Sequence, residues 1–333
     1  MPSPADTKIV LCIWHPFDQW RVPDWLPQAL RVRYPDLRVA HLPDYSGLDA
    51  AITDADIFAG FSLKPEQFAS ARKLKWIHCL AAGVNQLMRD DIRNSSVVIT
   101  NSRNVHAACM AEHTLGLILA LARRLPSAVR HQLNKHWAQQ EIWDEQPHPM
   151  EISGRTLTIV GYGAIGQELA RRAAACAMRV LGVKRDVTRG TEHAEAVFAP
   201  DRFGAALAEA DFVVLATPVL PETQHFFGAA QFAAMKKTAY FLNIGRGVLV
   251  DAEALVTALR NGQIAGAAID VAEVEPLPPE SPLWDAPNLL ITPHLSGVSE
   301  RLWHRHAALL FENLDRYFAG RELLNVVDKQ RGY

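Results

Sequence analysis

The segment from residue 156 to residue 175 constrains the fold of this chain more than any other. The apolar run Thr156–Val160 leads directly into the glycine pattern GYGAIG, and an alanine-rich helical stretch follows. In such a strand–turn–helix unit, Gly161 permits the tight turn, Gly163 lets the backbone approach a pyrophosphate, and Gly166 allows close helix–strand packing. The free N–H groups and the dipole at the helix N-terminus also favour phosphate. The segment therefore predicts the first unit of a dinucleotide-binding domain. The residues expected at the cofactor here are Gly161, Gly163, Ala164, Ile165 and Gly166.

Short apolar runs alternate with amphipathic stretches along the whole chain, which predicts an α/β fold with parallel strands. The strands expected in the first part are Lys8–Trp14, Val39–Leu42, Ile57–Gly60, Trp76–Cys79 and Val97–Thr100. The six expected in the second part are Thr156–Val160, Arg179–Val183, Phe212–Ala216, Tyr240–Asn243, Gly266–Asp270 and Leu289–Thr292. We therefore expect two Rossmann-like or flavodoxin-like domains, each built on a doubly wound parallel sheet.

The helical stretches indicate how the two domains divide the chain. A long apolar helix is expected over Ala107–Leu125, with Asn104 as its cap and Pro126 at its end, and a loop over Trp137–Met150. A last helix, Val298–Phe318, has no strand of its own to pack on. We expect it to return to the first part, which makes that domain discontinuous. The predicted domains are residues 1–101 with 296–333, and residues 102–295.

Charge and cysteine content argue against several classes of protein. The 34 Lys and Arg nearly balance the 36 Asp and Glu, for a net charge of -2, so no electrostatic footprint for nucleic acid or an anionic membrane is visible. The four cysteines are far apart and show no metal-ligand spacing, so we expect reduced thiols and no metal site. The sequence shows neither a signal-peptide pattern nor an apolar run of the roughly 20 residues that span a bilayer. We therefore expect a cytoplasmic protein that binds neither nucleic acid nor membrane.

The end of the second strand of the dinucleotide domain predicts which cofactor is preferred. An NAD enzyme places Asp or Glu there to bind the ribose 2′-hydroxyl, but this chain has Lys184 and Arg185. Two cations attract the 2′-phosphate of NADP, so we expect NADP to be preferred, with NAD possible. The alternative is that the pair is a solvated turn and Asp186 serves NAD. Further residues expected at the cofactor, because they follow strands of the sheet, are Thr217, Pro218, Ile244, Gly245, Arg246, Asp270 and His294.

Arg246, Glu275 and His294 follow three late strands, whose ends meet at one edge of a parallel sheet. Arg246 offers a fixed fork of donors for a carboxylate and a carbonyl. A histidine donates a proton near neutral pH, its reference pKa being about 6.5, and Glu275 is placed to orient the ring of His294. With a nicotinamide to carry hydride, the three predict reduction of a small 2-keto acid and require no metal.

The whole chain resembles the D-isomer-specific 2-hydroxyacid dehydrogenase family. The resemblance rests on six segments in order: Ala82-Gly83-Val84, Ala111-Glu112-His113, GYGAIG, NIGRG, Asp270–Pro276 and Thr292-Pro293-His294. It implies an oxidoreductase in which Arg246, Glu275 and His294 are catalytic. It also implies that the substrate is bound by backbone N–H groups of Ala82, Gly83 and Val84 together with Arg246 and His294. The domain containing residues 1–101 would then be the substrate domain, and the protein a homodimer.

Within that family, Pro276–Trp284 and the terminal Arg331-Gly332-Tyr333 resemble bacterial glyoxylate/hydroxypyruvate reductases, a branch that usually prefers NADPH. The chain departs from many relatives at Asn85, where they have Asp. Related reductases also imply that Trp143 reaches the partner subunit's substrate, dimer packing being the alternative. Two other functions stay open: a nucleotide-sensing protein similar to the C-terminal-binding-protein corepressors, and formate oxidation, although formate dehydrogenases usually have Gln where Glu275 stands.

Overall fold

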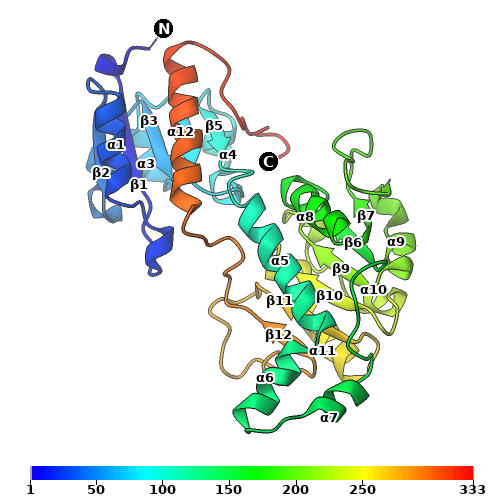
Figure 1. The fold of residues 1–333 in the computed structure, drawn as a ribbon. Coiled ribbons are helices and arrows are strands. Elements are labelled where there is room, and N and C mark those ends of the chain that lie inside the picture. Colours follow the sequence, from blue (N-terminus) through cyan, green and yellow to red (C-terminus); the bar gives the residue numbers. More distant parts are fainter. Residues whose placement is uncertain (1, 333) are drawn as a thin grey trace. The chain divides into compact units, whose positions relative to one another are not determined.

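The computed structural model describes residues 2–332, so Tyr333 of the C-terminal motif lies outside the described residues. The chain divides into two compact units, Met1–His106 with Val298–Tyr333, and Ala107–Gly297. Both are α/β units with helices packed on a parallel sheet (Figure 1), which confirms the predicted fold class. Within residues 2–332, no helix has the length and apolar character needed to cross a membrane.

The first unit is built on a five-stranded sheet of order β2-β1-β3-β4-β5, the order of flavodoxin-like folds. Its strands are β1 (Lys8–Cys12), β2 (Arg38–Leu42), β3 (Ile57–Gly60), β4 (Trp76–Cys79) and β5 (Val98–Asn101). Its helices are α1 (Trp25–Arg33), α2 (Leu48–Ala51), α3 (Pro65–Ser70), α4 (Asp90–Arg93) and α12 (Leu302–Phe318). Leu310 and Leu314 of α12 pack in one buried cluster with Ile9 and Trp76. The C-terminal helix therefore completes the core of the unit that the N-terminal strands begin.

The second unit holds a seven-stranded parallel sheet of order β12-β11-β10-β9-β6-β7-β8, in which the glycine turn follows the central strand β6. Its strands are β6 (Thr156–Val160), β7 (Arg179–Val183), β8 (Ala196–Phe198), β9 (Phe212–Leu215), β10 (Tyr240–Asn243), β11 (Gly266–Ile269) and β12 (Leu289–Ile291). The prediction of six strands was wrong by one. The missing strand β8 has only three residues, each partly exposed, at the edge of the sheet.

The helices of the second unit correct three sequence-based expectations. They are α5 (Ala107–Ala122), α6 (Leu125–Leu133), α7 (Gln139–Asp144), α8 (Ala164–Ala175), α9 (Phe203–Glu209), α10 (Ala229–Ala234) and α11 (Ala252–Arg260). The long helix ends at Ala122, and Pro126 lies in the first turn of α6, where proline is tolerated because its N–H would have no helical partner. Asn104 lies in a turn before α5 with φ 77°, so it does not adjoin the helix as a cap. The predicted loop after Trp137 contains α7.

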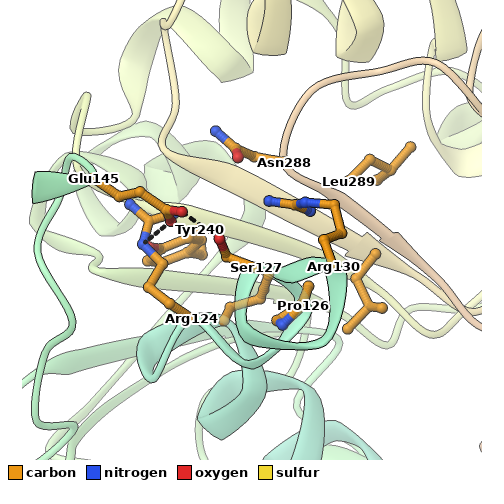
Figure 2. Close-up of a pocket in the computed structure, with 10 residues that line it drawn as sticks. Arg124, Pro126, Ser127, Arg130, Glu145, Tyr240, Asn288 and Leu289 are labelled. Carbon is orange, nitrogen blue, oxygen red and sulfur yellow. Dashed lines mark hydrogen bonds and ion pairs between the residues drawn. The ribbon is translucent and has the colours of Figure 1, made fainter. Parts of the chain in front are cut away.

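A small cavity lies at the edge of this sheet where the strands begin. Its volume is about 30 Å³, far below the roughly 300–1,000 Å³ of a ligand pocket. Figure 2 shows the Arg124 guanidinium next to Glu145 and Tyr240. Because Tyr240 and Leu289 open their strands, the cavity lies at the opposite edge from the strand ends where the predicted site residues follow. It is not the predicted site.

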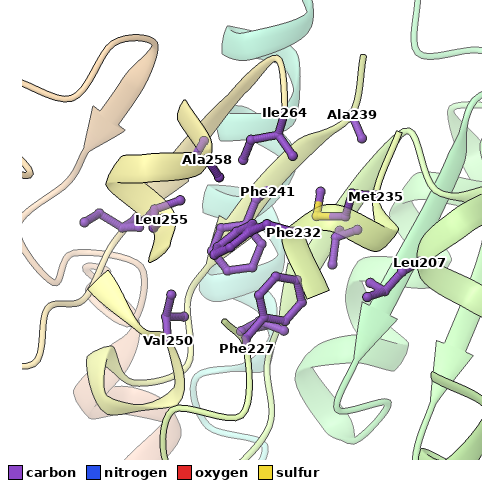
Figure 3. Close-up of a cluster of buried hydrophobic side chains, with 14 of the residues drawn as sticks. Leu207, Phe227, Phe232, Met235, Ala239, Phe241, Val250, Leu255, Ala258 and Ile264 are labelled. Carbon is purple, nitrogen blue, oxygen red and sulfur yellow. The ribbon is translucent and has the colours of Figure 1, made fainter. Parts of the chain in front are cut away.

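The strand ends are held by a core of aromatic rings on one face of the sheet (Figure 3). The ring centres of Phe227 and Phe241 are 4.6 Å apart, and Phe232 lies 5.0 Å from Phe227 and 5.3 Å from Phe241. All three rings are fully buried. Truncating a buried Phe to Ala costs about 3–5 kcal/mol, so this cluster makes β10 a rigid support for the residues that follow it.

Candidate active site

The glycine turn after β6 has the shape that a dinucleotide requires. Gly161 has φ 97°, and a Cβ there would lie 2.5 Å from the Thr217 backbone N. A Cβ at Gly166 would lie 2.8 Å from the carbonyl oxygen of Gly161, whereas a Cβ at Gly163 would meet nothing within 4 Å. Two glycines are therefore needed for packing, and the third faces open space at the N-terminus of α8. This open space beside free helical N–H groups fits a pyrophosphate.

The charged residues after β7 differ in what they contact. The Lys184 ammonium donates to the carbonyl oxygens of Arg189 and Gly190, so it ties the following loop to the end of the strand. Arg185 is exposed. One oxygen of Asp186 accepts hydrogen bonds from the Thr188 N–H and hydroxyl, which lower the pKa of Asp186. Arg185 is therefore the more exposed residue of the predicted pair.

Arg246 lies in a turn that Asn243 holds in place. The side chain of Asn243 accepts from the Gly245 N–H at 3.1 Å and donates to the Arg246 carbonyl at 2.9 Å. The Arg246 guanidinium donates to the Gly245 carbonyl at 2.7 Å. Loss of water around the guanidinium lowers the pKa of Arg246, while the charge of Glu275 opposes that shift. Arginine keeps its charge in proteins, so Arg246 is a cation near Glu275. Asn243 is a site residue that the sequence analysis did not single out.

Glu275 and His294 form a hydrogen-bonded pair. Glu275 Oε2 lies 2.7 Å from His294 Nδ1, and Glu275 Oε1 accepts from the Ala272 N–H at 2.9 Å. Both oxygens of the carboxylate are thus used, and the ring nitrogen Nε2 lies on the opposite side of the imidazole. His294 has φ 54°, a conformation that costs free energy for a residue with a side chain. Its N–H donates to the Asp270 carbonyl at 2.8 Å, which helps to hold that conformation.

Gly247 allows the Arg246 turn and the Glu275 loop to touch. A Cβ at this position would lie 1.9 Å from the carbonyl carbon of Ala272 and 2.1 Å from the backbone N of Glu273. No side chain fits there unless the backbone moves, because both nearest atoms belong to backbone. Gly247 therefore sets the distance between the two segments that carry Arg246 and Glu275. The sequence analysis quoted it only as part of the NIGRG motif.

Asp270, predicted at the cofactor, is engaged with the loop that carries His294. Its buried carboxylate accepts from the Thr292 hydroxyl at 2.6 Å and from the N–H groups of Leu295 and Ser296 at 2.9 Å each. The Thr292 hydroxyl also lies 3.1 Å from Nε2 of His113, whose pKa is lowered by burial and raised in part by Asp270. Asp270 thus ties down the residues on both sides of His294, and its contact with a cofactor stays a prediction.

The structure brings together the other predicted cofactor residues of this unit. A Cβ at Gly245 would lie 3.2 Å from the Thr217 carbonyl oxygen, and Gly161 adjoins the N–H of the same residue. The ends of β6, β9 and β10 therefore meet, with Pro218 exposed beside them and Ile244 buried. The predicted substrate loop Ala82–Val84 belongs to the first unit, where it follows β4.

Comparisons with known proteins show what the chain is similar to. A family model for the "D-isomer specific 2-hydroxyacid dehydrogenase, NAD binding domain" matches residues 115–296. A D-3-phosphoglycerate dehydrogenase of Methanocaldococcus jannaschii is 31% identical over 280 residues, covering 83% of this chain and 52% of that protein, so the chain spans about half of that relative. A glyoxylate reductase of Korarchaeum cryptofilum is 33% identical over 290 residues, covering 84% of each chain.

Solved structures are similar over nearly the whole chain. A D-isomer specific 2-hydroxyacid dehydrogenase from Xanthobacter autotrophicus, in complex with NADPH, has a TM-score of 0.83 at 30% identity, covering 98% of this chain and 100% of that one. An NADPH-dependent glyoxylate/hydroxypyruvate reductase from Sinorhizobium meliloti, in complex with NADP, has a TM-score of 0.82 at 26% identity, with the same coverage. The chain therefore belongs to the D-isomer-specific 2-hydroxyacid dehydrogenases and is an oxidoreductase that depends on a nicotinamide dinucleotide.

Proposed function

We propose that the enzyme reduces a small 2-keto acid, glyoxylate or hydroxypyruvate, to the D-2-hydroxy acid. The observation that carries this proposal is the 2.7 Å pair of Glu275 and His294, placed at the strand ends that also present Arg246. The names of the similar reductases support the choice of small 2-keto acids. In the proposed assignment, residues 102–295 bind the dinucleotide, and residues 1–101 with 296–333 bind the substrate.

The three residues have distinct roles in the proposed reaction. Bound NADPH would supply the hydride that the carbonyl carbon accepts. His294 gives the proton on Nε2 to the carbonyl oxygen, while its Nδ1–H donates to the Glu275 carboxylate, which stabilises the charged ring. Arg246 binds the carbonyl and carboxylate oxygens through its planar fork. The N–H groups of Ala82–Val84 bind the substrate carboxylate.

The first experiment follows the absorbance of NADPH and of NADH with glyoxylate, hydroxypyruvate, pyruvate and phenylpyruvate. Turnover is expected with glyoxylate and hydroxypyruvate. In His294→Asn, turnover is expected to fall by about 10²–10⁴-fold, because general acid catalysis contributes that much. The variant His304→Asn changes an exposed histidine of α12 and is expected to keep full activity. Binding of NADPH without turnover of any 2-keto acid would contradict the proposal and favour a nucleotide-sensing protein.

We further propose that NADPH is preferred over NADH through Arg185, with Lys184 shaping the loop beside it. Arg185→Ala is expected to lower kcat/KM for NADPH by about tenfold or more and to leave NADH unchanged, since a charge-assisted contact with the 2′-phosphate is lost. Arg260→Ala, an exposed arginine in α11, serves as the control. An unaltered ratio of kcat/KM for NADPH to kcat/KM for NADH would contradict the role of Arg185. It would favour the alternative in which Asp186 binds the ribose of NAD.

We propose that the enzyme is a homodimer in the cytoplasm, with small 2-keto and 2-hydroxy acids as its other partners. One face of α6 supports a dimer, because Leu125, Val129 and Leu133 are exposed at four-residue spacing. Trp137, beyond the end of the helix, is also exposed, and Trp143 stacks on His148 with ring centres 4.5 Å apart. Light scattering is expected to give twice the mass of one chain, and Leu133→Glu to give a monomer. A wild-type monomer would refute the dimer, and cell fractionation tests the location.

A further inference from the structure

Three successive carbonyl groups at the start of the predicted substrate loop, those of Ala81, Ala82 and Gly83, are bound by buried residues of the first unit. The loop follows β4, and three successive carbonyl oxygens accept hydrogen bonds from neighbouring residues. The bonds run from the Ser102 N–H to Ala81 (3.0 Å), from the Asn101 side-chain amide to Ala82 (2.8 Å) and from the Cys79 thiol to Gly83 (3.7 Å). Burial raises the pKa of Cys79 to about 12, so its thiol keeps the proton that it donates.

The N–H groups of the same peptides face the other way. In a trans peptide, the C=O of one residue and the N–H of the next are antiparallel. Fixing the carbonyls of Ala81, Ala82 and Gly83 therefore directs the N–H groups of Ala82, Gly83 and Val84 away from the interior. None of these three N–H groups has an acceptor within residues 2–332. Three successive unbound N–H donors suit an anion such as a carboxylate.

One of the three peptides is held only by a side chain of a distant strand. The Ala82–Gly83 peptide adjoins a glycine, whose backbone torsions are the least restricted, and its carbonyl is bound by the amide of Asn101. Asn101 is the last residue of β5, and its side chain is buried with 3% of the residue exposed. Its own backbone is fixed on both sides, because its N–H donates to the Asn325 carbonyl and its carbonyl accepts from the Asn325 amide.

We propose that Asn101 is a positioning residue of the substrate site, which orients the Gly83 N–H toward the substrate carboxylate. This inference rests on the proposed function. Without the amide, the Ala82–Gly83 peptide is free to rotate, which removes one N–H donor and turns a carbonyl oxygen toward the bound anion. A hydrogen bond to a charged group contributes about ten- to a hundredfold in affinity.

The test compares Asn101→Ala and Asn101→Asp with the wild type. Both variants are expected to raise KM for glyoxylate at least tenfold, with less than a threefold change in kcat and an unaltered Kd for NADPH. Asn101→Asp keeps the size of the side chain but has no donor, so it is expected to be no better than alanine. The control is Gln67→Ala, which removes another buried amide of the same unit, bonded to Lys64 and Asp49, and is expected to leave KM unchanged.

A second measurement uses the wild type and does not depend on the variants folding. The unreactive dicarboxylate oxalate is added to the NADP-bound enzyme labelled with ¹⁵N-glycine, and the Gly83 amide signal is expected to move. An unmoved Gly83 signal with oxalate bound, or a folded Asn101→Ala with wild-type KM, overturns the role of Asn101 alone. A wild type that binds no oxalate and reduces no 2-keto acid overturns the proposed function and this inference together.

Discussion

Gly247→Ala tests whether the spacing of the Arg246 turn and the Glu275 loop controls activity. The substitution adds one methyl group at a position where the backbone is outside the left-handed region, so alanine is compatible with its torsion angles. The added Cβ would lie 1.9 Å from the Ala272 carbonyl carbon, and ordinary contact begins at 3.4 Å. The turn and the loop must therefore separate by about 1.5 Å, because neither atom belongs to a flexible side chain.

The size of the effect follows from that displacement. A misplacement of catalytic groups by 1 Å costs about 10²-fold in rate, so kcat/KM for glyoxylate is expected to fall by 100-fold or more. Forcing a methyl group into packed backbone costs about 1–3 kcal/mol of stability. Since the total free energy of unfolding is about 5–15 kcal/mol, the variant is expected to remain folded. Activity should thus fall much further than the folded fraction.

The assay measures kcat/KM with NADPH alongside thermal unfolding followed by circular dichroism. Gly204→Ala is the matched control, because a Cβ on Gly204 in α9 would meet nothing within 4 Å. It is expected to keep full activity and to gain about 0.5–1 kcal/mol of stability from the better helix former. A cooperatively folded Gly247→Ala whose kcat/KM stays within threefold of wild type would refute the reasoning.

Three further changes probe other groups. Arg246→Lys keeps the charge but loses the planar fork, so steady-state kinetics should show kcat/KM about 10–100-fold lower. A kcat/KM equal to that of the wild type would contradict the role of Arg246 in binding the substrate. Asp270→Asn cannot accept from all three of its donors, so kcat should fall about tenfold. Fluorescence titration should show unchanged affinity for NADPH. A loss of NADPH affinity without a fall in kcat would favour contact between Asp270 and the cofactor. Burial lowers the pKa of His78 to about 4, whereas a histidine in the unfolded chain has a pKa of about 6.5. As pH falls from about 6.5 to 4, the unfolded state therefore binds the proton first, and the folded state loses roughly 3 kcal/mol of stability. Thermal melts of His78→Asn should show a smaller fall in Tm over that pH range than those of the wild type. Equal falls in Tm for the two proteins would exclude the effect.

The strands were predictable from sequence because each crosses the interior of a parallel sheet. A strand covered on both faces is an apolar run that begins and ends with the strand itself. The predicted and observed bounds coincide for Ile57–Gly60, Trp76–Cys79, Thr156–Val160, Arg179–Val183 and Tyr240–Asn243. Strand β8 carries no such run, since its three residues are partly exposed at an edge that pairs on one side only. Strand β8 forms because it pairs with β7, and this pairing cannot be predicted from the composition of β8 alone.

The break between α5 and α6 shows where helical periodicity stops being informative. Apolar residues continue to Leu125, so the pattern predicts a helix that ends there, beyond the observed end of α5 at Ala122. Arg124 adopts φ 57° between α5 and α6, and its guanidinium donates to the Pro147 carbonyl. The sequence around Arg124 does not predict this contact with a residue 23 positions away, which helps to hold the bend. Pro126 does mark the interruption, but as the start of α6 and not as the end of α5.

For the candidate site too, some features could be predicted from local sequence and others depend on contacts between distant segments. The topology rule that parallel strands end at one edge singles out Arg246, Glu275 and His294 from the sequence. What holds them there depends on contacts between segments that are far apart in the chain, such as Gly247 against the loop after β11. A carboxylate at a strand end has the same sequence pattern whether it faces a ligand or binds the loop beside it. Only the positions of neighbouring donors separate the two, and three donors of the His294 loop surround Asp270.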